Sequence, residues 1–343
     1  MKMHKALKAV FITLACLLLI LLLLIAAVFI FGNIYLNKID RTEITGNINL
    51  AEDEIFDGPT VDATDSNEEI EAVKKEFEEA QKIGVQKVSG IENILLIGAD
   101  RHGQGENGRS DSMILVSINH NTGNIHLTSF MRAMYVCIPR SNGSVWSMLN
   151  AAYSWGGPNL LVDTIELNFR VKIDKYVVVD FAAFEKAVDL LGGVEIELTE
   201  KEAAHVKSNS GVPTAAGKQL LNGAQTRGYC QIRKIDNDFA RTARQRKVIN
   251  VLLQKAKNMD LSTMLAIADE ILPMVNTNLS NSEILVYLSR AIPMLKNPVT
   301  QRMLPIENEA GTSYIGRIYV GGREMYRVDF EKNIKALHEF IGS

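Results

Sequence analysis

The 343-residue sequence has few cysteines and no large excess of charge of either sign. Its three cysteines are Cys16, Cys137 and Cys230, and no CxxC pair or Cys/His spacing predicts a zinc site. Cys16 lies in a long apolar run, so at most one disulfide can form, between Cys137 and Cys230; the sequence leaves that pairing open. A net charge of −3 does not favour nucleic-acid binding. The missing GxSxG and P-loop motifs argue against an α/β-hydrolase and a P-loop nucleotide site.

The clearest feature that is present is an apolar run near the N-terminus. Residues 9–32 contain no charge, and a helix of this length spans the roughly 30 Å hydrocarbon core of a bilayer. Lys2, Lys5 and Lys8 precede it, which predicts a cytoplasmic tail at 1–8. A cleaved signal peptide is the alternative, but the run exceeds the usual roughly 7–15 residues and no small-residue cleavage site follows. We therefore predict a single-pass plasma-membrane protein with a cytoplasmic N-terminus and an extracytoplasmic C-terminal domain.

Residues 33–90 are expected to form a juxtamembrane linker and helix. The stretch 50–69 is acidic and rich in turn-forming residues, which is typical of a solvated segment. The following EEIEAVKKEFEEAQKI has apolar residues at helical spacing, at Ile70, Val73, Phe77 and Ala80. We interpret it as a solvent-exposed spacer helix.

Residues 91–343 are expected to form one α/β domain. The runs NILLIGAD, DSMILVSIN and IHLTSF, joined by short connections, predict an antiparallel meander of three strands. Further strands alternate with helices, which predicts a three-layer α/β/α fold with a mixed central sheet, preceded by the transmembrane helix at 9–32. The stretch 200–224 is predicted to be a polar loop, and RGYCQIRK a strand or the approach to one.

Three polar residues are predicted to meet at one edge of this sheet. In an antiparallel meander, Asp100 at the end of the first strand, Asp111 at the start of the second and Arg132 after the third share an edge. Carboxylates suit Mg²⁺, and arginine suits phosphate. This combination is typical of phosphoryl transfer, where positioning and charge stabilisation dominate catalysis. The alternative is that the carboxylates simply cap strand ends.

A second polar cluster occupies residues 233–247, RKIDNDFARTARQRK. Arg241, Arg244 and Gln245 have the spacing of one helix face, and Asp238 lies near the helix start, where negative charge is favourable. A helix N-terminus with arginines on one face can hold an anion. A solvated basic face is the alternative. An exported domain would not meet DNA.

These motifs together resemble the LytR-CpsA-Psr family over roughly residues 91–260, in the family's order. The matching stretches are NILLIGADRHGQGENGRSDSMILVSIN, TSFMRAMYV, LNAAYSWGGPNLLVDTIELNF, IDKYVVVDFAAFEKAVDLLGGVEIELT and IRKIDNDFARTARQRKVI. The resemblance implies an apolar pocket for a polyprenyl chain. It also implies phosphotransferase activity that moves an anionic glycopolymer, such as teichoic acid, from a polyprenyl-pyrophosphate carrier to a peptidoglycan sugar hydroxyl.

The resemblance also assigns roles to residues. Asp100 and Asp111 match the aspartates associated with Mg²⁺ at the pyrophosphate. The residues that match substrate-contacting positions are Arg109, Arg132, Arg233, Asp238, Arg241, Arg244 and Gln245. Those expected to carry catalysis are Asp111, Arg132, Arg233 and Arg241.

The sequence departs from the family pattern at two positions. Ala133 stands where the family usually has an acidic residue, and Gln231 stands where it usually has an arginine. Both changes fall in the expected site, which leaves open a paralogue that binds the carrier without transferring the polymer. A membrane-linked attenuator of transcription is a further reading, and it would have to act indirectly, because no helix-turn-helix is evident.

Overall fold

The computed structural model describes residues 37, 39–41, 67–100, 108–284, 286–287, 297–306 and 316–343. The predicted transmembrane helix at 9–32 lies outside these residues. None of the helices in the described ranges is long and apolar enough to cross a membrane.

A mixed sheet of seven strands forms the centre of the domain, in the order β1-β10-β7-β2-β3-β4-β11. The predicted antiparallel meander is confirmed as β2, β3 and β4, while β7 runs parallel to β2 and β11 parallel to β4. The strands of this sheet are β1 (Asp40–Arg41), β2 (Ile91–Asp100), β3 (Arg109–Asn119), β4 (Ile125–Phe130), β7 (Lys175–Asp180), β10 (Val275–Thr277) and β11 (Val299–Leu304).

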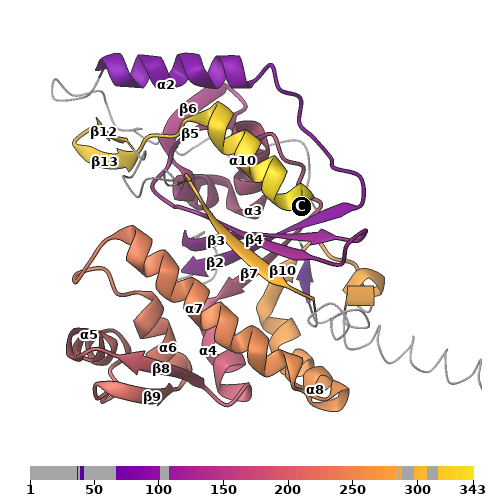
Figure 1. Cartoon of the computed structure of the whole chain (residues 1–343), viewed down its shortest axis with the longest axis vertical. Helices are drawn as coiled ribbons and strands as arrows, with labels where there is room; N and C mark the ends of the chain where they lie inside the picture. Colours follow the sequence, from indigo (N-terminus) through magenta and orange to yellow (C-terminus); the bar gives the residue numbers. More distant parts are fainter. Residues whose placement is uncertain are drawn as a thin grey trace, which may run out of the picture.

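Helices cover both faces of this sheet, with α2, α3 and α10 on one side and α4 and α7 on the other (Figure 1). The alternation of side chains explains this, because Leu95 and Ile97 enter the core under α3 while Leu96 and Ile114 pack toward α7. The predicted mixed α/β fold is therefore confirmed. The helices are α2 (Asn67–Ala80), α3 (Leu149–Phe169), α4 (Phe181–Leu190), α5 (Glu200–Ser210), α6 (Gly223–Cys230), α7 (Asp238–Lys257), α8 (Leu261–Ile271), the 3-10 helix η1 (Leu272–Met274) and α10 (Phe330–Gly342).

Three two-stranded antiparallel sheets flank the central sheet. They pair β5 (Tyr135–Arg140) with β6 (Gly143–Met148), β8 (Val194–Leu198) with β9 (Gly217–Leu221), and β12 (Arg317–Val320) with β13 (Arg323–Tyr326). Cys137 on β5 and Cys230 on α6 are both free, so the disulfide that the sequence left open does not form.

The region predicted as a polar loop at 200–224 is instead ordered, and that prediction was wrong. It contains α5, β9 and the start of α6, and α6 also replaces the strand predicted for RGYCQIRK. Both helices begin with a capping box, Thr199 with Glu202 and Asn222 with Gln225. These reciprocal hydrogen bonds satisfy the first free amides of each helix and outweigh the local content of turn-forming residues.

Helix α2 is part of the core, so its interpretation as an exposed spacer was also wrong. Ile70, Val73, Phe77 and Ala80 are all buried. The Phe77 ring lies edge-on to Trp146 and to Phe330 of α10, with centroids 5.1 and 5.3 Å apart. Burying one large apolar side chain contributes roughly 1.5–3 kcal/mol, and this stripe therefore holds α2 on the domain despite its acidic exposed face.

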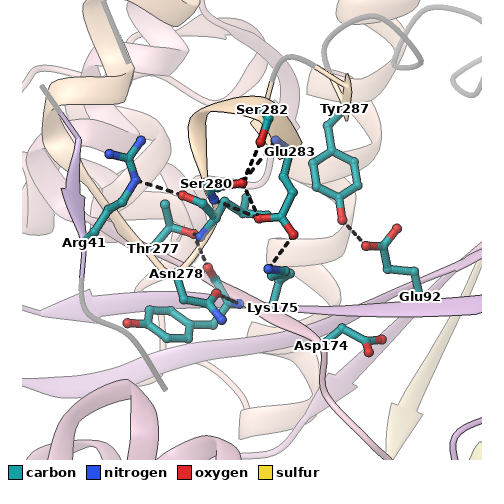
Figure 2. Close-up of polar contacts among 12 residues, drawn as sticks. Arg41, Glu92, Asp174, Lys175, Thr277, Asn278, Ser280, Ser282, Glu283 and Tyr287 are labelled. Atoms are coloured by element: carbon teal, nitrogen blue, oxygen red, sulfur yellow. Dashed lines mark hydrogen bonds and ion pairs between the residues drawn. The ribbon is translucent and has the colours of Figure 1, made fainter. Parts of the chain in front are cut away.

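The short strand β1 lies at one end of the sheet, paired in parallel with β10. Figure 2 shows the polar contacts of Arg41 on this strand and those of its surroundings. Arg41 Nε donates a hydrogen bond of 2.9 Å to the carbonyl of Leu279. Nearby, Lys175 Nζ lies 2.6 Å from Glu283 Oε1, and the Tyr287 hydroxyl donates to Glu92. Asp40 and Arg41, which follow the apolar run in sequence, are thus attached to the folded domain.

Candidate functional site

The candidate site lies where the end of β2, the start of β3 and the turn after β4 meet the N-terminus of α7. The predicted convergence of Asp111 and Arg132 is confirmed, because Arg132 Nη1 donates to Asp111 Oδ1 at 2.8 Å. The backbone of Asp100 lies at the same edge, paired with Arg109. The side chain of Asp100 lies outside the described part of the structure, and Arg109 is exposed.

Three arginines surround the carboxylate of Asp111, from three separate segments of the chain. Besides Arg132, Arg233 Nη2 lies 3.1 Å and Arg241 Nη1 3.7 Å from the same Oδ1 atom. Among the described residues, Asp111 Oδ2 accepts no hydrogen bond. One carboxylate cannot balance three guanidinium groups, so the cluster retains positive charge that favours an anion.

Asp238 connects two of these arginines from the first position of α7. Its Oδ1 lies 2.9 Å from Arg241 Nη2 and 3.4 Å from Arg132 Nε. The helix begins here because the Asn237 side chain accepts a hydrogen bond from the amide of Ala240. Burial lowers the pKa of Arg241, the charge of Asp238 raises it, and the nearby Arg132 lowers it further. With two carboxylates and three arginines, the described cluster still carries one excess positive charge.

The turn that presents Arg132 is fixed by backbone hydrogen bonds. The Asn150 amide donates to the carbonyl of Arg132 at 3.1 Å, and the Tyr326 amide donates to the carbonyl of Ala133 at 2.8 Å. The hairpin β12–β13 therefore supports the site from the far end of the sequence. Sequence reasoning missed Tyr326, whose pKa is raised by burial and by the charge of Asp238, because no local motif marks a residue so distant along the chain.

Arg244 does not join the cluster, although it was expected on the same helix face as Arg241. Its two terminal nitrogens donate to both oxygens of Asp236, at 2.6 and 2.8 Å, and Nη2 also donates to the carbonyl of Ile232 at 2.8 Å. These contacts hold the loop between α6 and α7, which carries Arg233. Arg244 thus positions part of the site from behind.

An apolar cavity of about 230 Å³ opens behind the cluster, between the sheet and helices α4, α6 and α7. Asp111, Arg233, Arg241 and Gln245 contribute polar groups to its wall. The remaining wall is mainly apolar, with Leu96, Ile114, Val179, Phe181, Phe184, Val248, Ile249 and Leu252. An apolar cavity with cationic groups at one side suits a ligand with an anionic head and a hydrocarbon tail.

Gln231, which stands where an arginine was expected, lies in the cavity wall beside a cation that sequence reasoning missed. Arg227 Nη1, one helical turn earlier, donates to Gln231 Oε1 at 3.0 Å, and Arg227 also lines the cavity. Arg227 pairs with Glu185 as well. The position of Arg227 one turn before Gln231 was a signal in the sequence, but only once this segment was recognised as a helix.

The thiol of Cys230 also lines the cavity, and burial raises its pKa to about 12. A thiol that stays protonated at neutral pH is a poor nucleophile. Covalent catalysis by cysteine is therefore not supported at this site.

The residues present fit a magnesium ion that binds together with phosphate. Within the described ranges no group of three or more His, Cys, Asp or Glu residues could hold a metal. Mg²⁺ nevertheless commonly uses one or two carboxylates plus phosphate oxygens. Asp111 Oδ2, which accepts no hydrogen bond from a described residue, is a suitable hard oxygen ligand.

The model of the LytR_cpsA_psr family matches residues 59–335. This chain belongs to the LytR_cpsA_psr family. The resemblance stated from the motifs is therefore confirmed, and the match also includes α2 and most of the C-terminal region.

Two curated relatives and one solved structure illustrate the similarity. A protein named polyisoprenyl-teichoic acid–peptidoglycan teichoic acid transferase TagU, from Oceanobacillus iheyensis, is 36% identical over 194 residues, covering 54% of this chain and 57% of TagU. Regulatory protein MsrR of Staphylococcus aureus is 34% identical over 225 residues, covering 64% of this chain and 66% of MsrR. The matched segments thus span less than two thirds of either relative.

The solved structure is that of TagT (YwtF) of Bacillus subtilis with bound octaprenyl pyrophosphate lipid. It is 21% identical with a TM-score of 0.56, covering 76% of this chain and 95% of that one. At this identity the likeness establishes the shared fold.

Proposed function

We propose that this protein transfers an anionic glycopolymer from a polyprenyl-pyrophosphate carrier to a sugar hydroxyl of peptidoglycan. The observation that carries the proposal is the cluster of Arg132, Arg233 and Arg241 around Asp111 at the wall of an apolar cavity. The cluster would bind the pyrophosphate and the cavity the adjoining part of the polyprenyl chain. The names of TagU and of the TagT complex describe similar proteins that act on or bind such molecules.

In the proposed reaction, the acceptor hydroxyl oxygen forms a bond to the phosphorus that carries the glycan. The bond from that phosphorus to the bridging oxygen breaks, polyprenyl phosphate leaves, and the hydroxyl proton passes to solvent. Negative charge grows on the leaving phosphate oxygens, where the three arginines would stabilise it. Asp111 and Asp238 would hold these arginines in position.

Magnesium is proposed as the cofactor, held by Asp111 and Asp100. When bound, it would neutralise part of the pyrophosphate charge. The arginines would then act on the remaining anionic oxygens.

We also propose that residues 9–32 anchor the protein in the plasma membrane, with the folded domain on the extracytoplasmic side. A lipid-linked donor remains in the bilayer, and an anchored enzyme meets it at a high local concentration. The attachment of β1 to β10 would keep the domain close to the point where the chain leaves the membrane.

A second candidate is a paralogue that binds the carrier without transfer, and Ala133 favours it. Ala133 has no carboxylate that could orient Arg132. The Oδ1 atom of Asp238, however, lies 3.4 Å from Arg132 Nε. In the transfer proposal Asp238 would supply this contact.

The test uses the full chain in detergent micelles with Mg²⁺, a lipid-linked donor and peptidoglycan fragments, with products followed by mass spectrometry. Wild type, Arg132→Ala and Ala133→Asp are compared. Turnover by wild type that is lost in Arg132→Ala is expected. Donor binding without turnover by wild type, together with activity gained in Ala133→Asp, would instead identify a binding paralogue.

A further inference from the structure

A groove separate from the apolar cavity follows the edge strand β11, bordered by α7 and α10. It has a volume of about 630 Å³. We call it the β11 groove and define it by its lining residues, Arg246, Gln301, Arg302, Met303, Ile306, Lys332, Lys335, Ala336 and Glu339. Four of these are cationic and one is anionic, in a chain whose net charge is −3. The groove is therefore a local concentration of positive charge.

Arg302 is held in the groove by two contacts with α10. Its Nη1 donates to the carbonyl of Ala336 at 2.7 Å, and its guanidinium carbon lies 4.8 Å from the centre of the Phe340 ring. A guanidinium fixed in this way loses little conformational freedom when an anion binds.

The two lysines of the groove are exposed and lie one turn apart on α10. Lys332 Nζ lies 2.8 Å from Asp329, and Lys335 Nζ 4.0 Å from Glu339. Exposed pairs of this kind typically contribute only about 0–1 kcal/mol, so an incoming anion can compete with the carboxylates for the lysines.

The groove runs along β11, away from the strand ends near Arg132. In the parallel pairing of β11 with β4, Leu304 is opposite Phe130, and its carbonyl accepts from the amide of Met131, next to Arg132. Arg302 is opposite Thr128, four residues before Arg132. At about 3.3 Å per residue, this places Arg302 roughly 7 Å along the strand from Phe130, the last residue of β4 before the turn that carries Arg132.

We propose that the β11 groove binds the anionic polymer segment of the donor, outside the pyrophosphate. The inference rests on the proposed transfer function and specifies its substrate class, a polymer with repeating phosphate or carboxylate groups. Repeating anions match cations spread along a groove, whereas a neutral glycan would gain little from them.

Charged residues beside an edge strand can also serve only to prevent pairing with other sheets. That role predicts aggregation of charge-removal variants, with no effect on polymer binding.

The test measures binding of a lipid-free poly(glycerol phosphate) oligomer to the full chain in detergent micelles, with a neutral dextran oligomer beside it. The variant is Lys332→Gln/Lys335→Gln. The matched control is Lys201→Gln/Lys207→Gln, which removes the same charge from exposed positions on α5. We expect wild type and control to bind the anionic oligomer equally, and the groove variant to bind it about fivefold more weakly at low salt.

Three results would overturn the proposal. The first is that the neutral oligomer binds as tightly as the anionic one, and the second is that both double variants lose the same amount of affinity for the anionic oligomer. The third is that the protein binds vesicles of anionic lipid through these lysines but does not bind the oligomer. The assay measures binding and needs no turnover, so its failure can be distinguished from a failure of the proposed transfer function. Arg132→Ala should keep oligomer binding even where it abolishes transfer.

Discussion

Two arginines on α7, Arg241 and Arg244, lie one helical turn apart, and their side chains are only 3% and 7% exposed. Their surroundings differ in charge balance. Arg241 shares Asp238 with Arg132, and burial together with this second arginine lowers its pKa despite the carboxylate. Burial also opposes the charge of Arg244, but the hydrogen bonds and charge of Asp236 outweigh it and raise the pKa of Arg244.

We infer from this difference that Arg241 can interact with a ligand, whereas Arg244 stabilises the fold. Arg244 has its own carboxylate and a backbone carbonyl, whereas Arg241 belongs to a cluster in which cations outnumber carboxylates. An anionic ligand would complete the charge balance around Arg241 and has no comparable role at Arg244.

The largest effect should come from Arg241→Ala. Removing one cation aimed at developing charge typically lowers turnover about 100- to 1,000-fold. We expect this loss in donor turnover, measured as kcat by product mass, while the cooperative unfolding transition remains. A variant with wild-type kcat would show that Arg241 does not contact the reacting phosphates.

Arg244→Ala should have the opposite profile. It removes the hydrogen bonds to Asp236 and Ile232, and we expect the free energy of unfolding to fall by about 2 kcal/mol. Urea unfolding measures this change. Because Arg244 acts on the site only through the loop that carries Arg233, kcat per folded molecule at low temperature should fall much less than in Arg241→Ala. A large loss of kcat in fully folded Arg244→Ala would remove the distinction between the two arginines.

The sequence predicted the part of the site that depends on strand order. Asp111 and Arg132 meet because antiparallel strands of known length return to one edge, and this follows from the apolar runs alone. The separation of Arg241 from Arg244 was not predictable, because helical spacing gives a shared face but not the partners on either side of it.

Tertiary contacts explain the errors in the fold. The apolar stripe of α2 was visible, but the α10 surface that covers it lies at the other end of the chain. The order in 200–224 depends on the capping boxes at Thr199 and Asn222, which are local and could have been recognised.

The apolar cavity allows a second comparison, which concerns the hydrocarbon tail of the proposed ligand. Leu252 lines the cavity, whereas Leu265 on α8 is 46% exposed. Leu252→Gln should weaken binding of a polyprenyl pyrophosphate about tenfold, because a polar group in the wall loses apolar contact with the chain. Leu265→Gln makes the same chemical change and should leave the Kd unchanged. Equal effects of the two variants would argue against hydrocarbon binding in this cavity.

The smallest effect concerns pH and tests how far Arg244 depends on the charge of Asp236. The hydrogen bond from Arg244 holds the pKa of Asp236 below its ordinary value in the folded chain. An aspartate of the unfolded chain titrates at about pH 4, so the Asp236 carboxylate stabilises the fold above that pH. This stabilisation is lost as the pH falls through the lower pKa of the folded state.

Asp236→Asn should therefore be less stable than wild type at neutral pH, and the difference should shrink as the pH is lowered toward about 2. Urea unfolding at a series of pH values measures the difference, with Asp269→Asn on the exposed face of α8 as the matched control. A difference that stays constant with pH would mean that Asp236 stabilises the loop before α7 by its shape and not by its charge. In that case the charge of Asp236 would not distinguish Arg244 from Arg241. The difference between the two arginines would then rest only on the excess positive charge around Arg241.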